Sequence, residues 1–202
     1  MDWLIDAFEP AFMQRALIGS LVAVVATSLV GTWVVLRGLA FLGDALAHGV
    51  IPGIALAVLW SFNPIIGAFV AAAVMSGLVS VVSNRTNVRD DTAIGLLFVG
   101  MLSLGIVIVS RANSFSTEVT ALLFGDVLGV TTLDIRSQVI AAAIVVIATI
   151  ALYRPFLALT FNPDKAQTLG MKPRLAQTAL LTLLALSIVA SFQAIGTLLV
   201  FG

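Results

Sequence analysis

The chain alternates between long apolar runs and short polar or charged segments. A helix that crosses the ~30 Å hydrocarbon core of a bilayer needs about 20 predominantly apolar residues. The pattern predicts an all-α fold, a polytopic transmembrane helical bundle that forms a single domain over residues 1–202. The predicted spans are residues 16–36, 39–60, 64–82, 93–109, 135–152 and 175–189, and an incomplete apolar segment follows at 194–202.

The basic residues between the spans predict the orientation. Lys and Arg are enriched in the cytoplasmic loops of membrane proteins. Segment 154–174 holds four basic residues and one acidic residue, so we expect a cytoplasmic loop there and, counting back through the spans, an extracytoplasmic N-terminus. This orientation holds only if the moderately apolar stretch 117–130 does not cross the membrane. We therefore predict that the stretch is an outer re-entrant or interfacial helix.

Composition and charge support a membrane protein and exclude several functions. Hydrophobic residues make up 60% of the chain and charged residues 10%, whereas globular proteins have about 25% charged residues. The formal net charge is zero, so the chain lacks the basic excess with which proteins neutralise nucleic-acid phosphates. The sequence contains no cysteine, which leaves carboxylate and imidazole as its strong metal ligands.

Two ionisable residues lie inside the second span. Asp44 and the only histidine, His48, are four residues apart and therefore share one helical face. A helix that begins near residue 39 places them about 7 and 13 Å along its axis. Ionisable groups at such depth are costly and usually face a bundle interior or a water-filled pathway. Gly49, Pro52 and Gly53 follow directly and predict a break in the helix beside this pair.

Two interpretations of this pair are open from spacing alone. In the structural one, Asp44 caps a helix that starts later than expected and His48 bonds to a backbone carbonyl. In the functional one, the pair binds a metal ion, and a symmetric dimer supplies two aspartates and two histidines. Such oxygen and nitrogen ligands suit Mn²⁺, Fe²⁺ or Zn²⁺.

The sequence contains no GxxxxGK[ST] phosphate-binding loop, so the chain cannot itself be a P-loop ATPase, and any pumping must take its energy from a partner protein or from a gradient. The candidate docking element is "NPDKAQTLGMKP" in the cytoplasmic segment, where Asn162 or Asp164 caps and Gly170 terminates a helix of about two turns. An ordinary solvated loop is the alternative interpretation.

Three segments carry a resemblance to a known family. "RGLAFLGDALAHGVIPGIAL" resembles the signature of the permease subunits of bacterial ATP-binding-cassette importers for zinc, manganese and iron. "NPDKAQTLGMKP" and "AIGTLLVF" are similar to two further family segments in the expected order. The resemblance covers essentially the whole chain and implies the type II importer permease fold.

The resemblance also implies partners and residue roles. The implied partners are a second permease subunit, most simply another copy of this chain, a dimer of cytoplasmic ATPase subunits and an extracytoplasmic metal-binding protein. The implied location is the bacterial plasma membrane. Asp44 and His48 become ligands for the transported ion, and no permanently bound cofactor is expected. The residues implied to couple the permease to the ATPase are Asp164, Lys165, Ala166, Leu169 and Gly170.

The resulting prediction is a transport subunit, not an enzyme, that imports divalent metal ions by alternating access. Family members usually continue beyond the "LLVF" segment, so we expect a product truncated at the C-terminus. Three alternatives stay open: a gradient-driven metal carrier, an inactive truncated fragment and a membrane scaffold that does not transport.

Overall fold

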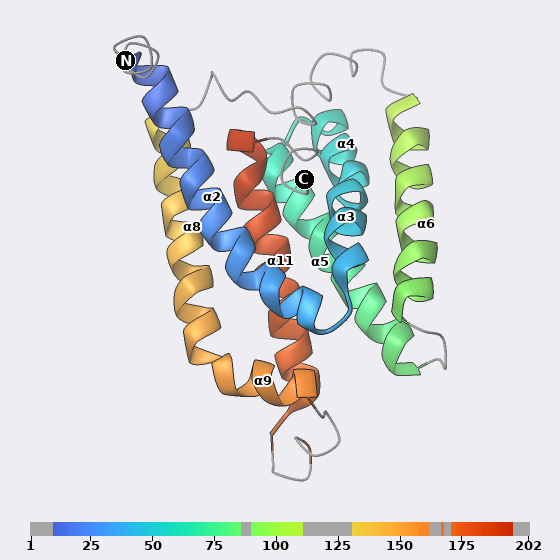
Figure 1. Ribbon diagram of the computed structural model, residues 1–202. Coiled ribbons are helices and arrows are strands. Elements are labelled where there is room, and N and C mark those ends of the chain that lie inside the picture. The colour runs from blue at the N-terminus through green and yellow to red at the C-terminus, as the bar shows by residue number, and fades with distance from the viewer. Residues whose placement is uncertain (1–9, 86–89, 111–130, 162–166, 168–170, 196–202) are drawn as a thin grey trace.

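The computed structural model describes residues 10–85, 90–110, 131–161, 167 and 171–195 (Figure 1). Every regular element among these residues is an α-helix, which confirms the predicted all-α fold class. In chain order the helices are α2 (Ala11–Leu36), α3 (Ala40–Gly49), α4 (Ile51–Leu59), α5 (Pro64–Arg85), α6 (Asp90–Ser110), α8 (Thr132–Ala151), α9 (Tyr153–Phe161) and α11 (Pro173–Ile195).

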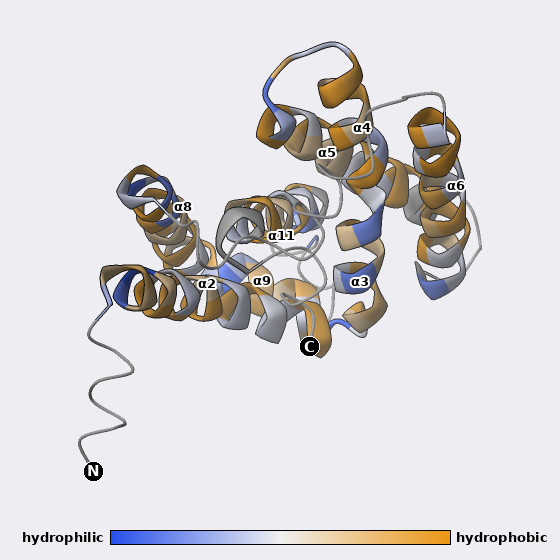
Figure 2. Cartoon of the chain, turned by 90° about the horizontal axis from the view of Figure 1, so that it is seen from above, coloured by the Kyte–Doolittle hydropathy of each residue, from blue (hydrophilic) through white to orange (hydrophobic). Residues whose placement is uncertain are grey.

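The helices match membrane dimensions. Five segments of the described chain are long and apolar enough to cross a bilayer, counting α3 and α4 together: Ala11–Leu36, Ala40–Leu59, Pro64–Val82, Asp91–Ser110 and Thr132–Ala151. Helix α11 adds 23 residues, whose apolar part is Leu175–Ser191. Figure 2 shows hydrophobic residues along the helices, including their outer sides. Those outer surfaces suit contact with lipid chains.

Two groups of helices form the bundle. Helix α11 packs against α2, α8 and α5, while α5 also packs against α4 and α6. Figure 1 shows α2, α8 and α11 on one side and α3 to α6 on the other. The fully buried side chains of Leu46, Met75, Val145 and Ile188 belong to one continuous core that runs through both groups.

The turn between α2 and α3 is a helix-terminating motif built on glycine. Gly38 has a φ of 71°, a conformation that glycine adopts without a steric penalty. Its amide donates to the carbonyl of Val35, and the amide of Leu39 donates to that of Val34. This pair of bonds is the Schellman pattern. It ends α2 at Gly38 and delivers the chain directly into α3.

Helices α4 and α5 approach each other through glycines. A Cβ atom on Gly53 would overlap the carbonyl oxygen of Gly67 and lie 2.6 Å from the Cβ of Ala71. A Cβ atom on Gly67 would overlap the carbonyl oxygen of Gly53 and lie 2.7 Å from the Cβ of Ala57. Small residues at a crossing allow membrane helices to pack backbone against backbone. Helices α4 and α5 are therefore held as a tight pair.

Helix α9 occupies the first part of the segment that was expected as loop 154–174. Figure 1 shows α9 running across the ends of the longer helices. Pro155 does not interrupt it, because a proline in the first turn lacks an amide that would be unpaired there anyway. Trp33 of α2 is buried and packs against two rings of α9. The centroid of its ring is 5.4 Å from that of Tyr153 and 5.6 Å from that of Phe156.

Candidate metal site on an interrupted helix

The second predicted span is divided into α3 and α4 at Val50. Pro52 has no amide hydrogen, so the carbonyl of His48 cannot accept the regular helical bond from it. The amide of Val50 still donates to the carbonyl of Leu46 at 3.2 Å. The helical pattern resumes when the amide of Ile54 donates to Val50 at 3.1 Å.

Neighbouring helices pack closely around this interruption. A Cβ atom on Gly49 would overlap the sulfur of Met75 on α5. On the other side, a Cβ atom on Gly105 of α6 would lie 2.9 Å from Cγ2 of Ile51 and 3.3 Å from the nitrogen of Pro52. Helices α5 and α6 therefore enclose the break, and the glycines provide the space for it.

Asp44 and His48 lie together on α3, immediately before the interruption. The N-cap of α3 is Leu39 and the helix begins at Ala40, so Asp44 is an interior residue. That position excludes the alternative in which Asp44 caps the helix. Nε2 of His48 is 3.7 Å from Oδ1 of Asp44. The distance is too long for a hydrogen bond, so the two groups face each other without one.

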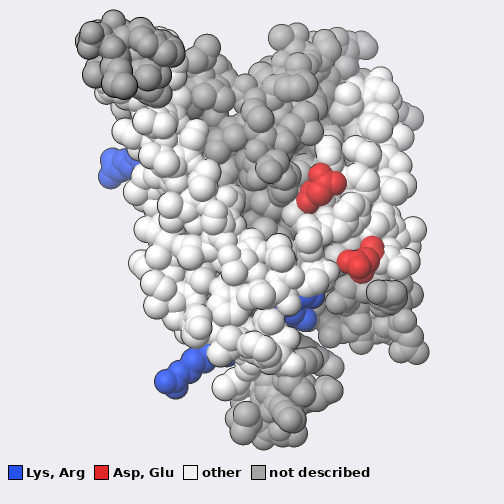
Figure 3. All heavy atoms as spheres, viewed as in Figure 1, with Lys and Arg blue, Asp and Glu red and all other residues white. Residues whose placement is uncertain are grey.

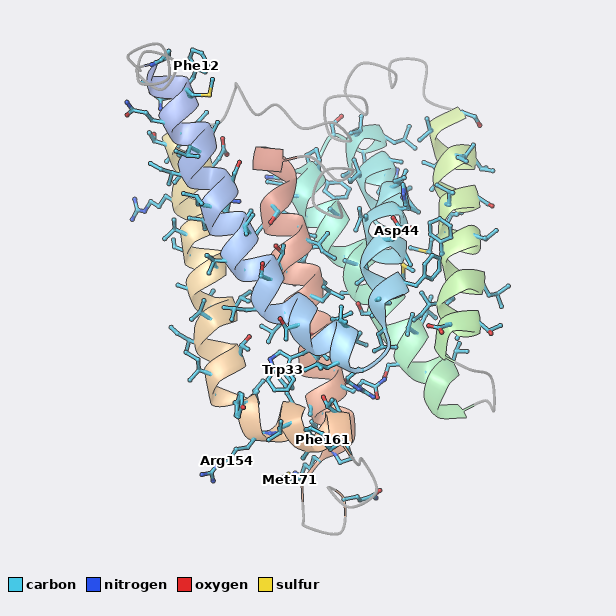
Figure 4. The ribbon with its side chains drawn as sticks, in the orientation of Figure 1. Phe12, Trp33, Asp44, Arg154, Phe161 and Met171 are labelled. Atoms are coloured by element: carbon cyan, nitrogen blue, oxygen red, sulfur yellow. The ribbon has the colours of Figure 1, made fainter. Side chains whose placement is uncertain are left out.

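The pair is open on one side of the single chain. The side chain of Asp44 is 51% exposed and that of His48 is 26% exposed. Figure 4 places Asp44 part-way up the bundle, well away from both ends of the longer helices. Figure 3, in the same orientation, shows a face that is mostly uncharged, with a few separate acidic and basic side chains. Ionisable groups at membrane depth that are open in this way need a polar partner or water.

The separation of the two ligand atoms suits a shared ion. Metal ions bind carboxylate oxygen and imidazole nitrogen at about 2.0 to 2.2 Å, so two ligands on one ion are about 3.0 to 3.4 Å apart. The observed 3.7 Å needs only a small rotation of either side chain to reach that range. Among the described residues no group of three or more His, Cys, Asp or Glu side chains gathers in one place. The described part of one chain thus offers two ligands and an open side.

Two aromatic residues complete the surroundings of the pair. The ring of Phe98 on α6 meets the imidazole of His48 edge to face, with centroids 5.6 Å apart and planes at 69°. The same ring contacts that of Phe41 on α3, with centroids 5.8 Å apart and planes at 71°. Sequence reasoning missed Phe98, because fifty residues separate it from His48 and an apolar run gives no sign of which phenylalanine faces the site.

The other predicted functional residues lie outside the described part of the chain. These are the coupling residues Asp164, Lys165, Ala166, Leu169 and Gly170, and the outer segment 117–130. Their roles and the orientation of the N-terminus stay predictions. The structure describes the residues that flank the coupling segment, namely α9 on one side and Met171 and Lys172 on the other (Figure 4).

Comparison with known proteins identifies the family. The ABC 3 transport family matches residues 9–202. The chain belongs to that family. A solved structure of PsaBC from Streptococcus pneumoniae in complex with Fab is similar to this permease with a TM-score of 0.82 and 30% identity, covering 98% of this chain and 71% of that one. The family resemblance and the importer permease fold predicted from the sequence are both confirmed.

Two relatives illustrate the family. A probable iron transport system membrane protein of Haemophilus influenzae is 34% identical over 199 residues, which are 98% of this chain and 73% of the relative. The manganese import system permease protein ScaB of Streptococcus parasanguinis is 34% identical over 189 residues, which are 94% of this chain and 67% of the relative. The relatives are named as transport membrane proteins or permeases, not as enzymes, and they extend beyond the region matched here.

Proposed function

We propose that this family member is the membrane-spanning permease subunit of an ATP-driven importer of divalent metal ions. The observation that carries the proposal is the Asp44 and His48 pair, which lies on the open side of an interrupted membrane helix with its ligand atoms 3.7 Å apart. Transporters place binding groups beside such breaks in membrane helices.

The donor atoms and the relatives indicate the class of cargo. One carboxylate and one imidazole suit Mn²⁺, Fe²⁺ and Zn²⁺, and the lack of thiolates keeps the affinity moderate enough for release. The relatives are named for manganese and iron. We therefore propose Mn²⁺ or Fe²⁺ as the first cargo to test, with Zn²⁺ as the third candidate.

A second permease subunit completes the proposed site. Two ligands leave most of the coordination positions of such an ion unfilled, and the exposed side of Asp44 gives access to another surface. If the second subunit is another copy of this chain, a two-fold axis brings two carboxylates and two imidazoles together. The pathway for the ion then runs between the subunits.

In the proposed cycle, the permease lies in the plasma membrane and its metal site is coupled to ATP hydrolysis on partner subunits. An extracytoplasmic protein delivers the ion, and cytoplasmic ATPase subunits act through residues 164–170. Nucleotide binding switches the side on which the site is open. The ion moves inward because its affinity for the site differs between the two states.

The test is uptake of radioactive Mn²⁺, Fe²⁺ and Zn²⁺ by cells that lack their own importers and express this chain with its ATPase and binding protein. We expect uptake to be abolished by Asp44→Ala and by His48→Ala, with the amount of protein in the membrane unchanged. The matched control is Asp91→Ala, which removes an exposed carboxylate at the start of α6 and should leave uptake unchanged.

A further pair of variants separates ATP-driven import from a gradient-driven carrier. An ATPase subunit that cannot hydrolyse ATP, or a Gly/Ser linker in place of residues 164–170, should stop uptake. Continued uptake with either change would favour the gradient-driven carrier. Normal uptake by both the Asp44→Ala and His48→Ala variants would refute the metal-site assignment itself.

A further inference from the structure

The imidazole of His48 contacts a residue of α6 that can fix its orientation. The imidazole is three-quarters covered, and the contacts that the structure defines for its ring are with Asp44 and with Phe98. Asp44 belongs to the same helix, four residues away, whereas Phe98 comes from a different helix. The orientation of the imidazole is therefore fixed across the interface between α3 and α6.

The geometry of the Phe98 contact is directional. Aromatic rings prefer edge-to-face arrangements with centroids about 4.5 to 7 Å apart, and the pair of His48 and Phe98 falls within that range at 5.6 Å and 69°. Phe98 also meets Phe41, seven residues before His48 on the same face of α3. One ring of α6 thus contacts α3 two turns apart, at both ends of the face that carries Asp44.

We propose that Phe98 is a positioning residue that holds the imidazole of His48 in the orientation in which Nε2 faces Asp44. The inference rests on the proposed function, in which the pair binds a divalent cation. Without the ring, the imidazole can turn toward the vacated space, and the ligand atoms must be brought together when the ion binds. Metal binding then weakens, because part of the binding free energy is spent on ordering the side chain.

The single histidine of the chain makes this proposal directly measurable. The full chain, purified through a tag without histidine and labelled with ¹⁵N-histidine, gives the two ring nitrogen signals of a single imidazole in lipid nanodiscs. Paramagnetic Mn²⁺ bound beside the ring broadens those signals. The concentration that gives half of the broadening measures binding at this site without any transport step.

We expect Phe98→Leu to raise that concentration about 3- to 10-fold, in line with the contribution of an aromatic pair. Phe98→Tyr keeps the ring and should stay within about twofold of the parent protein. The packing control is Met101→Leu, a conservative change at a partly buried position of the same helix, which should also stay within about twofold. Phe98→Met gives the same comparison if Phe98→Leu does not reach the membrane.

The outcomes distinguish this inference from the proposed function. If Phe98→Leu and Phe98→Met bind Mn²⁺ like the parent protein, or if Met101→Leu weakens binding as much as they do, Phe98 is only a packing residue. If the parent protein shows no broadening at millimolar Mn²⁺ and its imidazole signals do not shift with millimolar Zn²⁺ either, the metal site itself is refuted, and the positioning role is refuted with it.

Discussion

The contact between α4 and α5 gives a prediction whose magnitude follows from the structure. We consider Gly67→Ala, which adds one methyl group at the crossing. The new carbon would overlap the carbonyl oxygen of Gly53 and lie 2.7 Å from the Cβ of Ala57. Carbon atoms in contact are normally about 3.5 to 4.0 Å apart, so the two helices must separate by about 1 Å.

The cost of that separation is at the upper end of the range for overpacking. Inserting a methylene into a packed core typically costs about 1 to 3 kcal/mol. On α4 the obstacle is backbone, which no side-chain rotation can remove, so we expect a loss of about 3 kcal/mol in the free energy of unfolding. Gly77→Ala is the matched control on the same helix, because a Cβ atom there meets no heavy atom within 4 Å. Alanine is favoured over glycine in a helix, so the control should gain about 0.5 to 1 kcal/mol.

The assay is unfolding of the purified protein from mixed detergent micelles by titration with sodium dodecyl sulfate, followed by circular dichroism. The two variants should differ by about 3.5 to 4 kcal/mol, in opposite directions from the parent protein. If Gly67→Ala is as stable as the parent protein, or if Gly77→Ala loses as much as Gly67→Ala, the backbone contact does not hold α4 and α5 together.

Three further predictions concern the elements around the site. Trp33→Ala should cost about 3 to 5 kcal/mol in the same unfolding assay, because it removes a buried ring that contacts Tyr153 and Phe156; a loss below about 1 kcal/mol would show that α9 is held by other contacts. Thr131→Ala removes the capping box with Asp134 at the start of α8, so it should cost about 1 kcal/mol and accelerate hydrogen exchange of the first-turn amides. Unchanged exchange there would contradict a capping role. Pro52→Ala gives residue 52 an amide that can bond to the carbonyl of His48, so metal uptake should fall while stability is kept; unaltered uptake would mean that the interruption has no part in transport.

Local patterns in the sequence predict much of this fold. The apolar runs mark the long helices, since a bilayer demands a near-constant length of apolar chain. The four-residue spacing of Asp44 and His48 is enough to place them on one face, and Gly38 marks the turn before them. Helix α9 was hidden because its nine residues are too few for a span and its first turn holds Arg154 and Pro155, which are equally typical of a loop.

Contacts between distant helices are harder to predict from the sequence. The sequence shows that residues 64–82 are rich in small side chains, but not that Gly67 meets Gly53 rather than another helix. Phe98 is one aromatic residue in a helix whose hydrophobic residues lie on all sides, so periodicity does not tell which side faces α3. Such contacts depend on how the helices pack, which the local pattern does not specify.

The half-exposed carboxylate of Asp44 also bears on how cells make this protein. In the single chain that group is 51% exposed, and it lies nearer to the start of the span Ala40–Leu59 than to its centre. An aspartate at the centre of a membrane helix costs about 2.5 to 3.5 kcal/mol on insertion scales, so the cost at Asp44 is below that range. If the proposed second subunit covers the group, pairing removes this cost and unpaired copies are the less stable species. Cells continuously remove unstable proteins by proteolysis. The amount of permease that accumulates should therefore follow the supply of whichever subunit is scarcer.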